Sequence, residues 1–210
     1  VASQRHGSHP LVPPSLLVPA NARIAMAVGF TFMVGYFGLP FVMSLYLQQQ
    51  RGMSALATGA VFLPMMLVGL VLTPFSGRLV QRFSARTLIV TGLMSMAVGL
   101  VGSALLPATA PVWLIAVLMV LVGLGGPLVA PPITAVLLGS VPATLAGTAS
   151  GVFNTCRQIG GALAVAVFGA LLAQSTHFMT GLLISLFLAA GICVATALLS
   201  LRLRGTQSPH

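Results

Sequence analysis

The sequence predicts an all-α integral membrane protein with six transmembrane helices. Of its 210 residues, 58% are hydrophobic and only 4% are charged, whereas roughly a quarter of the residues in an ordinary soluble domain are charged. Its uncharged apolar runs are also long enough to cross a hydrocarbon core, which takes about 20 helical residues. Together these observations exclude a soluble enzyme.

Six apolar runs are separated by five short breaks of different composition. The break at 48–52 is polar, the break at 78–86 is basic, and prolines bound the break at 107–111. The remaining breaks lie at 139–142 and 174–177. The predicted membrane-spanning helices are therefore 22–47, 55–77, 87–106, 112–138, 145–173 and 178–201.

The charged residues predict how the helices are oriented. All nine are arginines, and they lie singly between apolar runs rather than on one basic face, which argues against a nucleic-acid partner. Basic residues are retained on the cytoplasmic side of a bilayer. We therefore expect a multi-pass protein of the cell (inner) membrane with both termini cytoplasmic, which leaves only Arg51 outside and Arg157 within a span. The seven arginines on the inner side are then Arg5, Arg23, Arg78, Arg82, Arg86, Arg202 and Arg204.

The chain is expected to have three parts. Four prolines between Pro10 and Pro19 prevent a regular helix, so residues 1–21 are predicted to form a cytoplasmic connector. Residues 22–201 are the six-helix transmembrane bundle, and residues 202–210 are a cytoplasmic tail. Because the chain starts at Val1 and lacks the features of a signal peptide, we expect a piece of a longer protein.

Glycine and proline cluster in the first and fourth predicted helices. If the six helices are two sets of three with inverted topology, these are the corresponding helices of the two sets. Interrupted helices at such positions point to a substrate cavity near the bilayer midplane. We therefore expect Gly38, Pro40, Gly126 and Pro127 to line a cavity. The alternative is that glycine and proline are simply common in transmembrane helices.

Arg157 is the only charged residue deep within a predicted helix. Asn154 and Gln158 share its face at helical spacing, whereas Phe153 and Cys156 are expected to point elsewhere. An arginine near the middle of a span costs about 2.5 to 3.5 kcal/mol on insertion scales. We therefore expect Asn154, Arg157 and Gln158 to face a substrate cavity or gate. The alternative is that Arg157 snorkels toward the cytoplasm and caps free carbonyl groups.

The cysteines and histidines predict neither a metal site nor a cofactor. Cys156 and Cys193 both lie within apolar runs, where free cysteine behaves as a small buried hydrophobe. The four histidines have no nearby carboxylate or thiol pair with which to form a set of ligands.

Two segments carry a family resemblance. The first is GRLVQRFSART at 77–87, and the second is ASGVFNTCRQIGGALAVAVFGALL at 149–172, which includes Gly160 and Gly161 after the Arg157 group. Both are similar to the major facilitator superfamily, and more narrowly to the C-terminal half of the fourteen-helix drug:proton antiporters. The resemblance implies that the chain is one half of a major facilitator fold, a 3+3 inverted repeat.

In that superfamily, the first segment joins two helices on the cytoplasmic side and helps to lock one conformation. Gln81 stands where the family usually has aspartate, and Ser84 where it has glycine, so this copy of the motif is degenerate. The candidate residues of this loop motif are Gly77, Arg78, Arg82 and Arg86.

The resemblance implies half of a secondary active transporter that exports lipophilic or cationic drugs by proton antiport and supplies one wall of the substrate cavity. Its partners would be the lipid bilayer, a missing N-terminal half and a small lipophilic substrate. Since the chain has no Asp or Glu, the proton-coupling group is expected in the missing half unless His177 serves. The alternative is a noncatalytic membrane subunit or a truncated, inactive transporter. An intramembrane protease at Ser150 is disfavoured, because a nucleophilic serine needs a positioned base.

Overall fold

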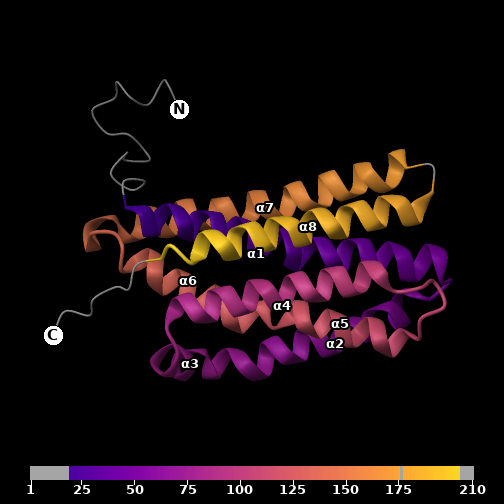
Figure 1. Cartoon of the computed structure of the whole chain (residues 1–210), viewed down its shortest axis with the longest axis horizontal. Helices are drawn as coiled ribbons and strands as arrows, with labels where there is room; N and C mark the ends of the chain where they lie inside the picture. The colour runs from indigo at the N-terminus through magenta and orange to yellow at the C-terminus, as the bar shows by residue number, and fades with distance from the viewer. Residues whose placement is uncertain (1–18, 176, 204–210) are drawn as a thin grey trace.

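The computed structural model describes residues 19–175 and 177–203, and this part of the chain is a bundle of long helices (Figure 1). The helices run back and forth along the long axis of the molecule, so consecutive spans are antiparallel. They are α1 (Ala20–Leu45), α2 (Ala55–Leu72), α3 (Ser76–Arg82), α4 (Ala85–Leu105), α5 (Val112–Gly123), α6 (Gly125–Leu138), α7 (Ala146–Gln174) and α8 (Phe178–Ser200).

Six stretches of this bundle are long and apolar enough to cross a membrane, which confirms the predicted number of spans and the all-α membrane fold. Short turns extend three of them: α1 continues through a π-helical turn, α2 continues into α3, and a 3-10 turn precedes α7. α5 and α6 form a single span. The six spans are Ala20–Gln50, Ala55–Arg82, Ala85–Leu105, Val112–Leu138, Ala143–Gln174 and Phe178–Ser200.

The polar break predicted at 48–52 is shorter than expected. The π-helical turn Tyr46–Gln50 carries the three glutamines, and the chain turns only at Gly52, whose φ of 64° is a conformation that glycine adopts without strain. Arg51 then fastens this turn to the α4–α5 connection, because its Nη2 donates to the Ala110 carbonyl oxygen at 2.7 Å and its Nη1 donates to that of Ala108.

The prediction of a basic break between helices at 78–86 is wrong, because most of this segment is helical. Arg78 and Arg82 lie on α3, and Arg86 lies in the first turn of α4. No glycine or proline interrupts the helix between Arg78 and Arg82. The connection is confined to Phe83 and Ser84, and the Ser84 side chain caps α4 by accepting a hydrogen bond from the Thr87 N–H at 3.2 Å.

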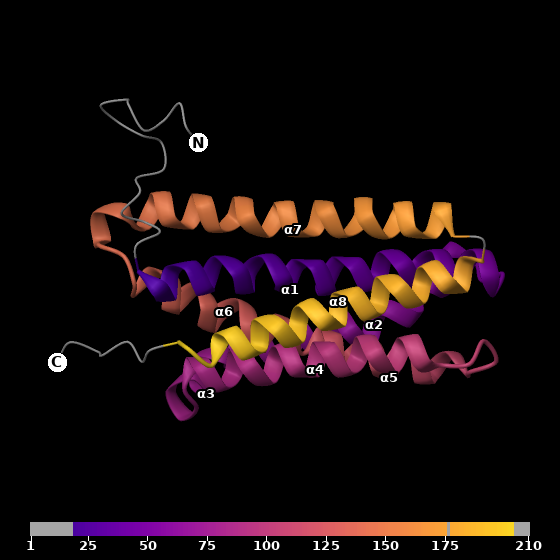
Figure 2. The ribbon, with the colours of Figure 1, turned by 45° about the horizontal axis from the view of Figure 1, so that its top comes forward.

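The packing between helices follows the two-fold pattern of an inverted repeat. α1 packs most extensively on α7, and α5 packs in the same way on α2, so the first span of each set of three contacts the second span of the other set. The third spans, α4 and α8, pack on each other. Figure 2 shows α7 and α1 side by side on one side of the bundle, with α4 and α5 on the other. Each repeat therefore contributes equivalent helices to the fold.

Glycines let α1 and α7 approach closely at several points of their contact. A Cβ atom at Gly160 would collide with the Phe30 carbonyl oxygen, and a Cβ at Gly38 would collide with the Phe168 ring. Small residues serve this purpose in membranes, where association depends on close packing. A buried hydrogen bond of 2.8 Å between the Thr31 and Thr196 hydroxyl groups also joins α1 to α8.

Candidate functional site

A cavity of about 740 Å³ lies where the first and second spans of both repeats meet. We call it the main cavity, and its walls come from α1, the α2 region, α6 and α7. Its volume is within the range of about 300 to 1,000 Å³ that is usual for small-molecule sites. The lining residues are Phe32, Met33, Tyr36, Phe37, Met66, Gly69, Leu70, Thr73, Pro74, Gly126, Ala130, Pro131 and Arg157.

A second cavity of about 510 Å³ adjoins the first and lies along α1 and α7. We call it the side cavity. Met33 and Phe37 of α1 line both cavities, and the Phe37 side chain is 52% exposed. The α7 residues at its wall are mostly small, so a ligand can approach the helix backbone there. They are Gln158, Gly161, Ala162, Val165 and Ala166.

Aromatic rings form most of the α1 wall of the main cavity. The Phe32 and Tyr36 ring centroids lie 5.0 Å apart, and those of Tyr36 and Phe37 lie 6.1 Å apart. Phe32 and Tyr36 are four residues apart, so successive helical turns present them on one face. The sequence analysis did not identify this row, although aromatic residues at helical spacing within an interrupted span are the signal that would have found it.

Arg157 of α7 supplies the charge at the main cavity. Its Cζ atom lies 6.0 Å from the Phe32 ring centroid and 5.7 Å from that of Phe153, distances at which a cation is attracted to an aromatic face. Its Nε atom is buried and has no hydrogen-bond partner among the residues that the structure describes. Arg157 therefore lies at the cavity wall with its hydrogen-bonding capacity incompletely used.

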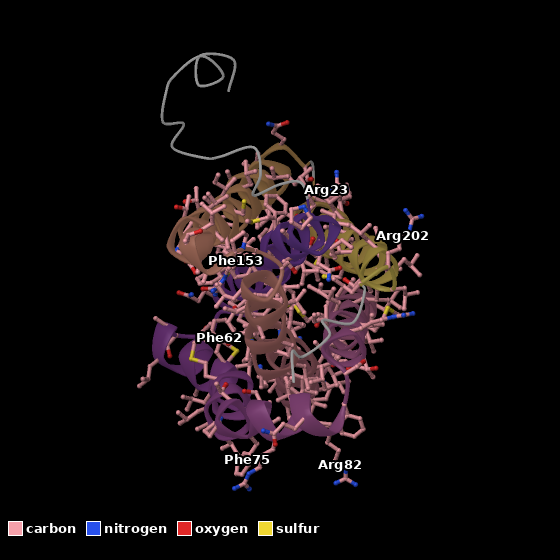
Figure 3. All side chains as sticks on the ribbon, turned by 90° about the vertical axis from the view of Figure 1, so that its left-hand side faces the viewer. Arg23, Phe62, Phe75, Arg82, Phe153 and Arg202 are labelled. Carbon is pink, nitrogen blue, oxygen red and sulfur yellow. The ribbon has the colours of Figure 1, made fainter. Side chains whose placement is uncertain are left out.

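The expectation that Phe153 points away from Arg157 is wrong. Phe153 is only 5% exposed, lies on the same side of α7 as Arg157 and packs against Gly29 of α1. The physical reason is that residues four apart on an α-helix lie on adjacent turns of one face. Figure 3, which views the bundle from the end where Arg23 and Arg202 lie, shows Phe153 between α7 and α1.

The other two predicted site residues on α7, Gln158 and Asn154, lie in different surroundings. Gln158 lines the side cavity, next to the main cavity that Arg157 lines. Asn154 is exposed, and the walls of these two cavities as described do not include it. Arg157 and Gln158 therefore face two adjoining cavities, and Asn154 lies outside the described walls of both.

Of the glycine and proline residues predicted to line a cavity, only some do so in the structure. Gly126 lines the main cavity, where a Cβ at its position would be 3.8 Å from the Tyr36 ring. Pro127 is buried, and the described walls of both cavities lack Pro127, Gly38 and Pro40. Gly38 instead lies against Phe168 in the contact between α1 and α7.

The candidate loop-motif residues lie together at one end of the bundle. Gly77, Arg78 and Arg82 are on α3, and Arg86 follows at the start of α4. The Arg78 guanidinium lies 5.9 Å from the Phe75 ring centroid. Figure 1 shows α3 at the same end of the bundle as the start of α1 and the end of α8.

This arrangement agrees with a comparison of the sequence with known protein families. The model described as Major Facilitator Superfamily matches residues 2–165. The chain belongs to this superfamily. The resemblance seen in the two sequence motifs is thereby confirmed at the level of the superfamily.

Curated members of the major facilitator superfamily resemble the chain over most of its length. It is 30% identical over 185 residues to the methylenomycin A resistance protein of Streptomyces coelicolor, covering 88% of this chain and 39% of that protein. It is 34% identical over 178 residues to the tetracenomycin C resistance and export protein of Streptomyces glaucescens, covering 81% and 32% respectively. It is 27% identical over 158 residues to the riboflavin transporter RibZ of Clostridioides difficile, covering 75% and 35%. The chain thus spans between about a third and two fifths of the length of these relatives.

Proposed function

We propose that this chain is the C-terminal half of a fourteen-helix drug:proton antiporter and forms one wall of its substrate cavity. The observation that carries this proposal is the main cavity, which combines an aromatic and methionine lining with one guanidinium group. Such a lining suits small lipophilic molecules, because apolar walls with few polar groups are typical of small-molecule sites. Several relatives are named as resistance or export proteins, which supports drug export as the activity.

An N-terminal half is proposed as the partner that covers the open side of the cavities. α2 and α7, which flank the main cavity, belong to the two least buried spans of the bundle. Leu56 and Leu70 of α2 are 87% and 72% exposed, and Ile159 of α7 is 48% exposed. Helices whose apolar faces flank a cavity are suited to pack on a second bundle, although lipid also satisfies such faces.

The candidate motif at 77–87 is proposed to act in the change between conformations. α3 presents Arg78 and Arg82 at the end of the bundle, next to the connection that joins the second and third spans. Arginines at such a position are suited to bind carbonyl or acidic groups of a neighbouring half in one conformation and to release them in the other.

The proposed function is tested by an efflux assay with the 210-residue chain and with the longer protein proposed to contain it. Proton coupling needs a group that changes protonation during the cycle, and the chain has no Asp or Glu. In energised vesicles, we therefore expect proton-driven export of a neutral lipophilic dye by the longer protein and none by the chain alone. Gradient-dependent export by the 210-residue chain would contradict the proposal that this chain is half of a transporter. If the longer protein exports no drug, the proposal that it is a drug exporter is contradicted.

Both termini are proposed to be cytoplasmic in the inner membrane, an orientation that follows the arginine asymmetry. Single cysteines at Gln49 and Ser84 test it, because these positions lie at opposite ends of the bundle. In intact cells, a membrane-impermeant thiol reagent is expected to label position 49 and to leave position 84 unlabelled until the cells are opened. Labelling of position 84 from outside would reverse the proposed orientation.

A further inference from the structure

The main cavity contains a cation that has no counter-ion among the residues that the structure describes. Arg157 is the only charged residue among those that line it, and the 210-residue sequence contains no Asp or Glu. Within the described residues, Arg157 makes no hydrogen bond, and its buried Nε has no partner. A charged group inside a membrane protein is costly unless an opposite charge or a set of polar groups accompanies it. Among the described residues, Arg157 therefore has no counter-ion.

The surroundings of Arg157 hold the guanidinium at the cavity wall. Phe32 of α1 and Phe153 of α7 lie beside it. Each ring centroid is within 6.0 Å of the Arg157 Cζ atom. The Gly29 position also brings α1 against the Arg157 side chain, since a Cβ there would be 3.1 Å from Cγ. A planar guanidinium placed between aromatic rings can still offer its terminal N–H groups, and its fork geometry matches a carboxylate.

The rest of the cavity lining adds a hydrogen-bond donor and aromatic surface. The half-buried Tyr36 hydroxyl group belongs to the wall and makes no hydrogen bond that the structure records within residues 19–175 and 177–203. Tyr36 stands in the aromatic row between Phe32 and Phe37. The wall therefore presents a cation, a hydroxyl donor and a row of rings, and it presents no carboxylate that would attract a cationic ligand.

We infer that the main cavity selects flat aromatic molecules that carry a single anionic acceptor such as a carboxylate, and that Arg157 is the residue that selects them. The inference rests on the proposed function and narrows its substrate class. It departs from the expectation of cationic drugs, because a cation in this cavity would meet Arg157 without a compensating negative charge. A small anionic ligand fits the volume of about 740 Å³ and supplies the missing counter-ion together with an aromatic surface for the α1 wall.

The test compares three anthracene probes that share one ring system and carry an anionic, a neutral or a cationic group at the same position: 9-anthracenecarboxylate, 9-anthracenemethanol and 9-(aminomethyl)anthracene. The 210-residue chain is placed in phosphatidylcholine nanodiscs, and each Kd is measured by fluorescence anisotropy against empty nanodiscs. A hydrogen bond to a charged group contributes about 1.5 to 3 kcal/mol, so the carboxylate is expected to bind at least about ten-fold more tightly than the amine.

The Arg157→Gln variant is expected to weaken carboxylate binding at least about ten-fold while changing alcohol binding by less than about two-fold. Arg202→Gln is the matched control, because it removes the same charge from an exposed position at the end of α8. It should bind all three probes like the unmodified chain. Arg157→Lys keeps the charge and should keep the carboxylate preference, which separates loss of charge from misfolding.

Four outcomes would overturn the inference. If Arg157→Gln binds the carboxylate as tightly as the unmodified chain, or if the amine binds as well as the carboxylate, the cavity binds aromatics without charge selection and only the proposed function survives. If no probe binds, the proposed cavity fails as well. If the effect of Arg157→Gln disappears in nanodiscs that also contain phosphatidylglycerol, a lipid headgroup is the counter-ion and the substrate assignment falls.

Discussion

Replacing Gly160 by alanine is expected to destabilise the bundle by about 1 to 3 kcal/mol, the usual cost of overpacking a close contact. The new Cβ would collide with the Phe30 carbonyl oxygen, which is part of the α1 backbone and cannot rotate away as a side chain would. α1 and α7 would then have to separate along the most extensive helix contact in the fold. Because those two helices form adjacent walls of the main cavity, ligand binding should weaken together with stability.

Gly161→Ala provides the control at the next residue. A Cβ at Gly161 would be 3.9 Å from the Phe37 ring, which is an ordinary van der Waals contact, so this variant should unfold like the unmodified protein. Thermal unfolding of both variants in one detergent checks the prediction. Equal stability of the two variants would show that the close approach of α1 and α7 at Gly160 is not required.

The number and character of the helices were predictable from the sequence because bilayer thickness fixes the length of a span. Hydropathy does not mark where a helix ends. Arg78 and Arg82 stand outside the apolar run and were assigned to a loop, yet no glycine or proline lies between them, and the chain passes from α2 through the 3-10 turn Thr73–Phe75 into α3, which carries both arginines. The fourth span was recognised as irregular, and its α5 and α6 segments do meet at Leu124, beside the glycines.

The candidate site was predictable in part. Arg157 and Gln158 could be found because polar side chains are conspicuous in an apolar helix, and Gly126 because it lies in an interrupted one. The α2 contribution, which includes Met66, could not be found, since it depends on how α2 packs against α5 and α6. Phe153 was misassigned because its hydrophobic character was given more weight than its position one turn before Arg157.

A comparison of thiol reaction rates tests most directly whether α1, α2, α6 and α7 surround a water-filled substrate cavity. Cys156 and Cys193 are first replaced by serine in the longer protein proposed to contain this chain, and single cysteines are then introduced. Gly126 lines the main cavity and Gln158 lines the side cavity. Val98 of α4 and Phe187 of α8 serve as lipid-facing controls. Their side chains are 56% and 45% exposed, and neither α4 nor α8 contributes to the described walls of the two cavities.

The reactive form of cysteine is the thiolate, which needs water to form, so a charged maleimide should modify positions in a wet cavity far faster than positions in lipid. We expect positions 126 and 158 to react at least about ten-fold faster than positions 98 and 187, and a bound substrate to slow reaction at 126. If the four positions react at similar rates, or if the two lipid-facing positions react faster, these helices do not surround an aqueous cavity and the proposed transporter wall is contradicted.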